Sequence, residues 1–197
     1  MAAAGPRRLT GFSGAVLCGG TSRRMGRDKA TLEVDGTAMA VRVAAALREA
    51  GAADVLAIGG DATALEALGL HVVPDDEPSE GPFPATLTAL RHAEAEVVVV
   101  LSCDLLAPDP ETIRSLVERL RGAPAEVAGA VPLVDAEPQW THAAWRRDAL
   151  GRLASARRRG VRSLRTAAAE VAVLLVDDLP AAATADADEP RDLQGDG

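Results

Sequence analysis

The sequence predicts an α/β protein with a single-domain, doubly wound, mostly parallel sheet and a small antiparallel addition. Strand-like and helix-like segments alternate regularly as far as Arg121, as in a chain built from βαβ units. Val97–Leu101 is a continuous apolar run, which is typical of a central strand covered on both faces. A glycine-rich, cationic loop follows the first predicted strand, where open α/β sheets bind their ligands.

Short apolar runs bounded by glycine predict the parallel strands, and polar caps predict the helices between them. The expected strands are Ser13–Cys18, Val55–Ile58, His71–Val73 and Val97–Leu101. The expected helices are 37–50, 62–68, 85–94 and 109–121. Thr37 is the expected cap of the first helix, and Asp109-Pro110 is the expected start of the last. Thr31–Gly36 alternates and ends in Asp-Gly, which favours a hairpin.

Beyond Arg121 the pattern changes, because two strand-like runs follow each other without a helix between them. Val127–Val134 and Gln139–Trp145 therefore predict antiparallel additions to the sheet, which we expect to carry a second substrate. Two short helices and a last strand are expected over Arg147–Arg158, Ser163–Ala169 and Val171–Val176. The expected division is a flexible leader over 1–12, one domain over 13–193 and a frayed tail over 194–197.

Charge and composition exclude several classes of protein. The formal net charge is −8, which argues against a nucleic-acid partner and makes a local cluster of cations more informative. Since no segment approaches a membrane span and the N-terminal residues lack an apolar signal stretch, we expect no membrane partner and a cytoplasmic location. Cys18 and Cys103 lack metal-ligand spacing, so buried, reduced thiols are expected, close together if their strands are neighbours.

The loop from Cys18 to Lys29 has the composition of a polyphosphate site. Gly19 and Gly20 allow a tight turn that exposes backbone amides to an anion. Four cations of the loop supply positive charge for phosphate, and the arginines add forked hydrogen-bond donors. The four cations are Arg23, Arg24, Arg27 and Lys29. The loop lacks both the Walker sequence and G-x-G-x-x-G, and a solvated basic turn is the alternative.

Asp104 is expected at the carboxyl end of the central strand, facing the phosphate loop. Since Asp109 already caps the next helix, Asp104 is available as a ligand for Mg²⁺. The histidines have no zinc-site spacing and are interpreted as ordinary strand or helix residues; they are His71, His92 and His142.

Two further polar segments are informative. Pro74–Pro84 contains four prolines, and it is too long for a tight turn, so it predicts a functional wall. Arg157–Arg162 is either a solvated helix end or a site for an anionic second substrate, and we favour the helix end.

The string Leu17–Lys29 matches L-x-G-G-x-S-x-R-M-G-x-D-K, a signature of nucleotidyltransferases that act on the molybdenum cofactor. Further matches are Val73-Pro-Asp75, Gly81-Pro82, Ser102-Cys-Asp104 and Asp186-Ala-Asp-Glu-Pro190. The chain therefore resembles the MobA-type molybdenum cofactor guanylyltransferases along nearly its full length. This resemblance implies a Rossmann-like nucleotidyltransferase fold.

The resemblance also implies roles for individual residues. The implied nucleotide-binding residues are Leu17, Cys18, Gly19, Gly20, Arg23, Arg24, Lys29, Asp75 and Asp104. Lys29, Arg24 and Asp104 are implied to be catalytic, with Lys29 on phosphate and Mg²⁺ on Asp104. By the same resemblance, Asp75 belongs to the guanine nucleotide site. Asp186 and Asp188 fall on the segment that lines the pterin side in the family.

The implied reaction transfers GMP from GTP to the terminal phosphate of molybdopterin or its molybdenum form and releases pyrophosphate. Other cofactor-biosynthesis proteins and molybdoenzymes are candidate partners. The chain departs from the family pattern where Cys18 follows Leu17, and where Asp186 and Asp188 replace asparagines. The alternatives are the use of CTP, transfer to another phosphorylated acceptor, and a non-catalytic cofactor carrier on the same fold.

Overall fold

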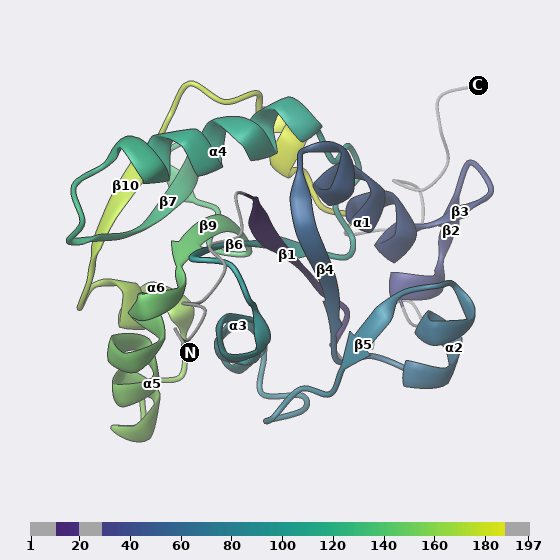
Figure 1. Cartoon of the computed structure of the whole chain (residues 1–197), viewed down its shortest axis with the longest axis horizontal. Helices are drawn as coiled ribbons and strands as arrows, with labels where there is room; N and C mark the ends of the chain where they lie inside the picture. Colours follow the sequence, from purple (N-terminus) through teal and green to yellow (C-terminus); the bar gives the residue numbers. More distant parts are fainter. Residues whose placement is uncertain (1–10, 20–28, 188–197) are drawn as a thin grey trace, which may run out of the picture.

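An eight-stranded sheet runs through the molecule between two layers of helices (Figure 1). The structure is a computed structural model, and it describes residues 11–19 and 29–187. The strands of the sheet are β1 Phe12–Leu17, β4 Ala52–Ile58, β5 His71–Val73, β6 Val97–Ser102, β7 Val127–Val134, β8 Glu137–Pro138, β9 His142–Arg146 and β10 Ala172–Val176. The expected tail over 194–197 and most of the expected leader lie outside the described residues.

The strand order is β10-β7-β9-β6-β1-β4-β5, with β8 paired to β7. Along this path only β9 runs antiparallel to its neighbours, β6 and β7, within the described residues. A separate antiparallel pair is formed by β2 Glu33–Val34 and β3 Thr37–Ala38. The predicted mostly parallel sheet with a small antiparallel part is therefore confirmed.

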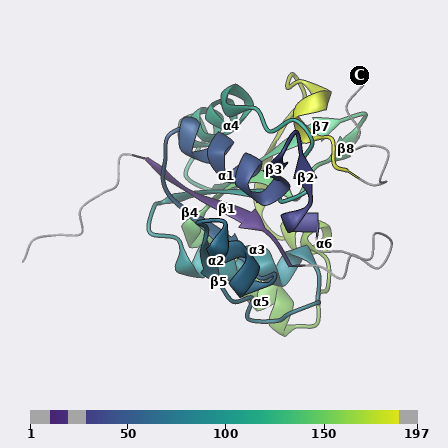
Figure 2. The ribbon, with the colours of Figure 1, turned by 90° about the vertical axis from the view of Figure 1, so that its right-hand side faces the viewer.

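Helices cover both faces of the sheet. The helices are α1 Met39–Glu49, α2 Ala62–Ala67, α3 Pro82–His92, α4 Pro110–Gly122, α5 Leu150–Arg158 and α6 Leu164–Ala168. The 3₁₀ turns are η1 Lys29–Thr31, η2 Arg147–Ala149 and η3 Ala181–Thr184. Figures 1 and 2 show α1 and α4 on one side of β1, and α3, α5 and α6 on the other.

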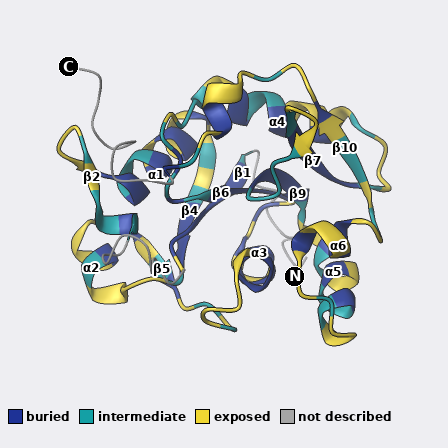
Figure 3. Cartoon of the chain, turned by 180° about the vertical axis from the view of Figure 1, so that it is seen from behind, coloured by how far each residue is buried: buried dark blue, intermediate teal, exposed yellow. Residues whose placement is uncertain are grey.

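The two faces of the sheet carry two separate apolar clusters. Side chains alternate along a strand, so Val99 joins the cluster under α1 and α4 while Val98 joins the cluster under α3 and α5. The burial colouring shows β6 and α3 in dark blue (Figure 3), and eight consecutive residues of α3, from Phe83 to Leu90, are buried. The central strands and α3 are thus the most enclosed part of the core.

Several predicted boundaries were wrong, and each has a local cause. Thr37 does not cap α1, because it lies in β3 and the cap position is Ala38, without a side-chain hydrogen bond. α3 begins at Pro82, which takes the N1 position where a proline needs no amide hydrogen, so the end of the predicted wall is helical. The two predicted antiparallel additions do pair with each other, but β9 is inserted within the main sheet and β7 runs parallel to β6.

The start of α4 agrees with its prediction. The Asp109 side chain accepts hydrogen bonds from the amides of Glu111 and Thr112, and Pro110 follows at N1. The Thr112 hydroxyl also donates to the Asp109 carboxylate at 2.5 Å. This hydroxyl is the main reason that the pKa of Asp109 lies below its ordinary value of 3.8, and the two amides lower it further.

No helix in the described part of the chain is both long enough and apolar enough to cross a membrane.

We expect Asp109→Ala to lower the free energy of unfolding at pH 7 by about 1 kcal/mol, because two amides and a hydroxyl lose their acceptor. Since the pKa of Asp109 is depressed in the folded state, its stabilisation is present above the ordinary pKa of 3.8 and is lost as the pH falls through the folded value. Urea unfolding of the variant and the parent at neutral and acid pH measures both effects. Glu118→Ala, at an exposed acid of the same helix, is the control, and an equal loss there would contradict the cap.

Candidate active site

The site lies where β1, β4 and β6 end at the same edge of the sheet. Leu17 is in register with Ile58 on one side and with Ser102 on the other. The pairing continues one residue further, because the Cys18 amide donates to the Ile58 carbonyl at 2.9 Å and the Cys103 amide to the Leu17 carbonyl at 3.1 Å. Both cysteines are buried, as predicted, at the ends of neighbouring strands.

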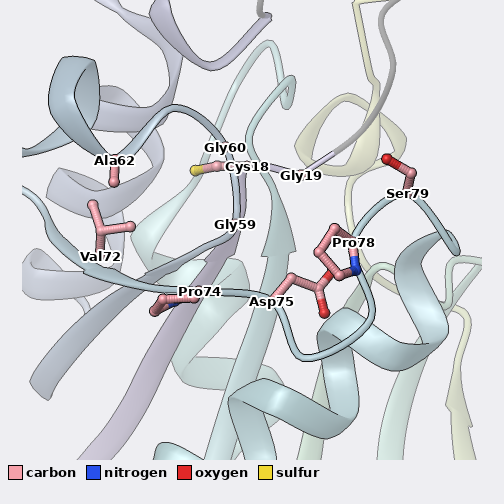
Figure 4. Close-up of a pocket in the computed structure, with 10 residues that line it drawn as sticks. All are labelled: Cys18, Gly19, Gly59, Gly60, Ala62, Val72, Pro74, Asp75, Pro78 and Ser79. Atoms are coloured by element: carbon pink, nitrogen blue, oxygen red, sulfur yellow. The ribbon is translucent and has the colours of Figure 1, made fainter.

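A cavity of about 420 Å³ opens beside the end of β1. It is lined by Cys18, Gly19, Gly59, Gly60, Ala62, Val72, Pro74, Asp75, Pro78 and Ser79. Figure 4 shows Asp75, Pro78 and Ser79 on the side opposite Ala62 and Val72. The segment after β5 therefore forms one wall of the cavity, and the start of α2 forms the facing wall.

Two glycines after β4 line the cavity and add no side chain to its floor. Gly59 and Gly60 have φ of +71° and +81°, in the left-handed region that favours glycine. A Cβ on Gly60 would lie 2.9 Å from Leu65 Cδ1 and 3.1 Å from both Cβ and the carbonyl oxygen of Cys18. Both the backbone angle and the close approach to Cys18 thus require glycine at this position.

Asp75 is the acidic group of the cavity, and one of its oxygens is already bound. Asp75 Oδ1 accepts a hydrogen bond from the Glu77 amide at 3.1 Å, and the Thr88 hydroxyl lies 3.4 Å from the same oxygen. Asp75 Oδ2 faces Gly19, because a Cβ placed on Gly19 would lie 3.8 Å from it. A ligand with two adjacent N–H donors would find its acceptor on this side of the cavity.

The second part of the site is an ion pair at the end of β6. Lys29 Nζ lies 2.7 Å from Asp104 Oδ2 and also donates to the Ala187 carbonyl at 2.6 Å. The Ser102 hydroxyl donates to the other oxygen of Asp104. The side chains of Lys29 and Asp104 are 22% and 14% exposed, so the pair is largely shielded but open to a ligand on one side.

The segment 185–187 closes this edge from the far end of the chain. The Leu106 amide donates to the Ala185 carbonyl at 2.9 Å, and the Ala187 amide donates to the Asp104 carbonyl at 2.8 Å. Asp186 lies between these two contacts, and its Oδ1 is 3.1 Å from Nε2 of His142. Neither of these two atoms has a hydrogen bond of good geometry among the described residues, although both are buried.

His142 was missed as a residue of this edge. It is the first residue of β9, it is 1% exposed, and it is paired in register with Leu101. Only the insertion of β9 beside β6 brings it to Asp186, and this order cannot be inferred from the histidine spacing. His71 and His92 are an exposed strand residue and an exposed helix residue, as interpreted from the sequence.

The predicted site residues divide into three groups. Leu17, Cys18 and Gly19 lead into the cavity that holds Asp75, whereas Lys29, Asp104 and Asp186 gather at the end of β6. The remaining predicted residues lie outside the described residues; they are Gly20, Arg23, Arg24 and Asp188.

The basic run is the largely exposed end of α5, as favoured from the sequence, and Arg157 is the exception. The Arg157 side chain is only 10% exposed and pairs with Glu77 and Glu80 in the wall of the cavity. Arg162 pairs with Glu80, and Arg159 with Glu170. The charge of these three arginines is therefore matched by acidic side chains of the chain itself.

We expect Gly60→Ala to destabilise the fold more than Gly69→Ala. Both glycines have a positive φ, but a Cβ on Gly69 would meet nothing within 4 Å, whereas one on Gly60 would press on Cys18. The backbone angle costs each variant about 1–2 kcal/mol, and overpacking adds about 1–3 kcal/mol at Gly60. Denaturant unfolding of the two variants measures the difference, and equal losses would contradict the tight floor.

Comparisons with known proteins agree with this architecture. Residues 14–174 match the MobA-like NTP transferase domain. The chain is 40% identical over 110 residues to a probable molybdenum cofactor guanylyltransferase from Pelotomaculum thermopropionicum, across 56% of this chain and 53% of the relative. It is 36% identical over 135 residues to one from Haloferax mediterranei, across 66% of this chain and 62% of the relative.

The fold is also found among solved structures. Molybdopterin-guanine dinucleotide biosynthesis protein A from Archaeoglobus fulgidus superposes with a TM-score of 0.74 at 21% identity, covering 92% of this chain and 94% of that chain. At this identity the likeness speaks for the fold alone, and the two curated relatives are matched over 53% and 62% of their own length. The match over residues 14–174 covers most of the sequence, and the chain belongs to the family of proteins with a MobA-like NTP transferase domain.

Proposed function

We propose that the chain is a nucleotidyltransferase that transfers GMP from GTP to the terminal phosphate of molybdopterin or its molybdenum form. The observation that carries the proposal is the placement of Lys29 and Asp104 at the end of β6, next to the strand that leads into the cavity of Asp75. The family and the names of the curated relatives support the same activity.

The cavity is the proposed site of the guanine base. Guanine presents two adjacent donors, its N1–H and its 2-amino group, and a carboxylate accepts both well. Asp75 Oδ2 lies on the Gly19 side, and Oδ1 accepts a hydrogen bond from the Glu77 amide. Cytosine lacks this pair of donors, so the carboxylate favours GTP over CTP.

The triphosphate is proposed to extend from the cavity across the end of β1 toward Lys29. In the described structure Lys29 and Asp104 neutralise each other at 2.7 Å. An arriving triphosphate offers Lys29 a stronger anionic partner and leaves the Asp104 carboxylate available for a cation. Lys29 then stabilises the negative charge that develops on the leaving pyrophosphate.

The residues at this edge fit Mg²⁺ brought in with the nucleotide. Asp104 offers one carboxylate, and no group of three or more His, Cys, Asp or Glu side chains among the described residues could hold a metal by itself. Magnesium in nucleotide sites is typically held by one or two carboxylates together with phosphates and water. When bound, Mg²⁺ would supply positive charge to the triphosphate oxygens.

The bond changes of the proposed reaction need little acid–base chemistry. A phosphate oxygen of the acceptor bonds to the α-phosphorus of GTP, the bond from that phosphorus to the bridging oxygen breaks, and pyrophosphate leaves. Because the attacking oxygen is already anionic, alignment and charge neutralisation carry the catalysis. Asp186, at the closing segment, is the proposed contact for the pterin side of the acceptor.

The test of the function is pyrophosphate release with Mg²⁺, in which GTP is compared with CTP in the presence and absence of molybdopterin. Release that requires both GTP and molybdopterin supports the proposal. Release with CTP, or only with another phosphorylated acceptor, would assign a different nucleotide or acceptor as the substrate. Binding of GTP without release under any of these conditions favours a cofactor carrier.

We expect Asp104→Ala to lower Mg²⁺-dependent turnover by about 10²–10³ while the fold remains intact, because the carboxylate proposed to hold the charge-neutralising cation is lost. The readouts are pyrophosphate release and thermal unfolding. Asp178→Ala is the control, since it also removes an ion-paired carboxylate, 2.7 Å from Arg119. Turnover like that of the parent in Asp104→Ala would refute the metal assignment.

We expect Asp75→Asn to raise the KM for GTP by about tenfold to 100-fold with little change in kcat, since a charged hydrogen-bond acceptor is lost from the base site. Asp61→Asn is the matched control, because Asp61 caps α2 beside the cavity and asparagine is an equally good cap. An unchanged KM for GTP in Asp75→Asn would remove Asp75 from the guanine site.

A further inference from the structure

The wall of the cavity is anchored from outside by α5. Residues 74–81 connect β5 to α3, and α5 packs beside α3 (Figure 1). Arg157 reaches from the last turn of α5 to Glu77, with Nε and Nη2 lying 3.2 Å and 2.6 Å from Glu77 Oε2. The same Nη2 lies 3.1 Å from Glu80 Oε2. One guanidinium therefore holds two acidic residues of the wall.

Burial sets Arg157 apart from the other basic residues nearby. Its side chain is 10% exposed, whereas that of Arg162, which also contacts Glu80, is 73% exposed. An ion pair shielded on one side is screened less by salt than one in open solvent. The hydrogen bonds to Glu77, then to Glu80, raise the pKa of Arg157 above its ordinary value, which accords with a guanidinium held in place by two carboxylates.

Glu77 links this ion pair to the carboxylate inside the cavity. The Glu77 side chain points to Arg157, while its backbone amide donates to Asp75 Oδ1 at 3.1 Å. The position of Glu77 therefore fixes one hydrogen bond of Asp75, and with it the direction of Oδ2 toward Gly19. Pro78 and Ser79, which follow Glu77 directly, line the same cavity.

The wall needs such an anchor because its backbone is irregular. Ser79 has a φ of +66° and Gly81 one of +90°, so the chain turns twice through the left-handed region within three residues. A short connection of this kind is held by its side-chain contacts rather than by a helix or a sheet. The ion pair of Arg157 with Glu77 lies between these turns and Asp75.

We propose that Arg157 and Glu77 are positioning residues that set the base specificity of the cavity, by holding Asp75 in the orientation that accepts the two donors of guanine. This inference rests on the proposed function, and it adds a residue of α5 to the control of the nucleotide. Arg157 itself is not among the residues that line the cavity. It acts through the backbone of Glu77.

The experiment compares Arg157→Ala with Arg159→Ala, using pyrophosphate release with GTP and with ITP at saturating molybdopterin and Mg²⁺. ITP lacks the 2-amino group, so it tests how well Asp75 accepts both donors. In Arg157→Ala we expect the KM for GTP to rise about threefold to tenfold, the kcat to change less than about twofold, and the preference for GTP over ITP to fall. Arg159 pairs with Glu170 at the same helix end and lies outside the wall, so its removal leaves all three values unchanged.

Two further variants separate positioning from simple loss of folding. Arg157→Lys keeps the charge but loses the forked contact, so it partly restores the preference for GTP. Glu77→Gln keeps the backbone amide but weakens the ion pair. If both residues act through the same contact, the double variant Glu77→Gln/Arg157→Ala has no higher KM for GTP than either single variant. If Arg157→Ala does not fold, Arg157→Lys and Glu77→Gln carry the test.

Failure of this inference is distinguishable from failure of the proposed function. The positioning role alone is overturned if the parent protein turns over GTP and both variants, Arg157→Ala and Glu77→Gln, keep the parent's KM for GTP and its preference for GTP over ITP. A parent that binds GTP without turnover overturns the proposed reaction, and the GTP dissociation constants of the same variants then decide the positioning role. A parent that binds no GTP overturns both.

Discussion

The parallel pairing of β1 with β4 on one side and with β6 on the other is the constraint on which the site depends. Parallel strands all end at the same edge, so three segments far apart in the sequence reach that edge together. Residues at the ends of β1 and β4 and in the segment after β5 line the cavity, and the turn after β6 carries Asp104. Gly59 and Gly60 add no side chain to the cavity, and the segment after β5 brings the Asp75 carboxylate.

Contacts from the second half of the chain complete this edge in two places. Ala187 accepts a hydrogen bond from Lys29, and Asp186 lies beside the buried His142. On the other side of the cavity, Arg157 holds the wall through Glu77. The cavity is therefore lined by residues of the first half of the chain, while contacts from the second half reach its wall and Lys29.

Much of this arrangement could be predicted from the sequence, because short-range signals carry it. The glycines and lysine of the loop after β1, the apolar run of β6 before Asp104, and the Asp109-Pro110 start of α4 are local patterns with local causes. The predicted start of α1 at Thr37 was wrong because a two-stranded pairing competes there with a helix cap.

The remaining contacts could not be predicted because they depend on the order of strands in space. Nothing in the sequence around His142 indicates that β9 is inserted between β6 and β7, and only this insertion places the histidine beside Asp186. Arg157 belongs to a run of three arginines with no feature that separates it from its neighbours. Its role follows from the packing of α5 on α3, which turns one arginine inward toward the wall and leaves Arg159 outside.

The hydrogen bond from Lys29 to Ala187 also bears on the order in which the protein is made. It joins residues 158 positions apart, and a chain that emerges from the ribosome with its N-terminus first has β1, the cavity and Asp104 long before it has this partner. Until Ala187 emerges, the ammonium group of Lys29 lacks this acceptor, and the edge of the sheet beside Asp104 lacks its covering segment. The covering of this edge therefore arises late in synthesis, after all the strands of the described sheet have been made.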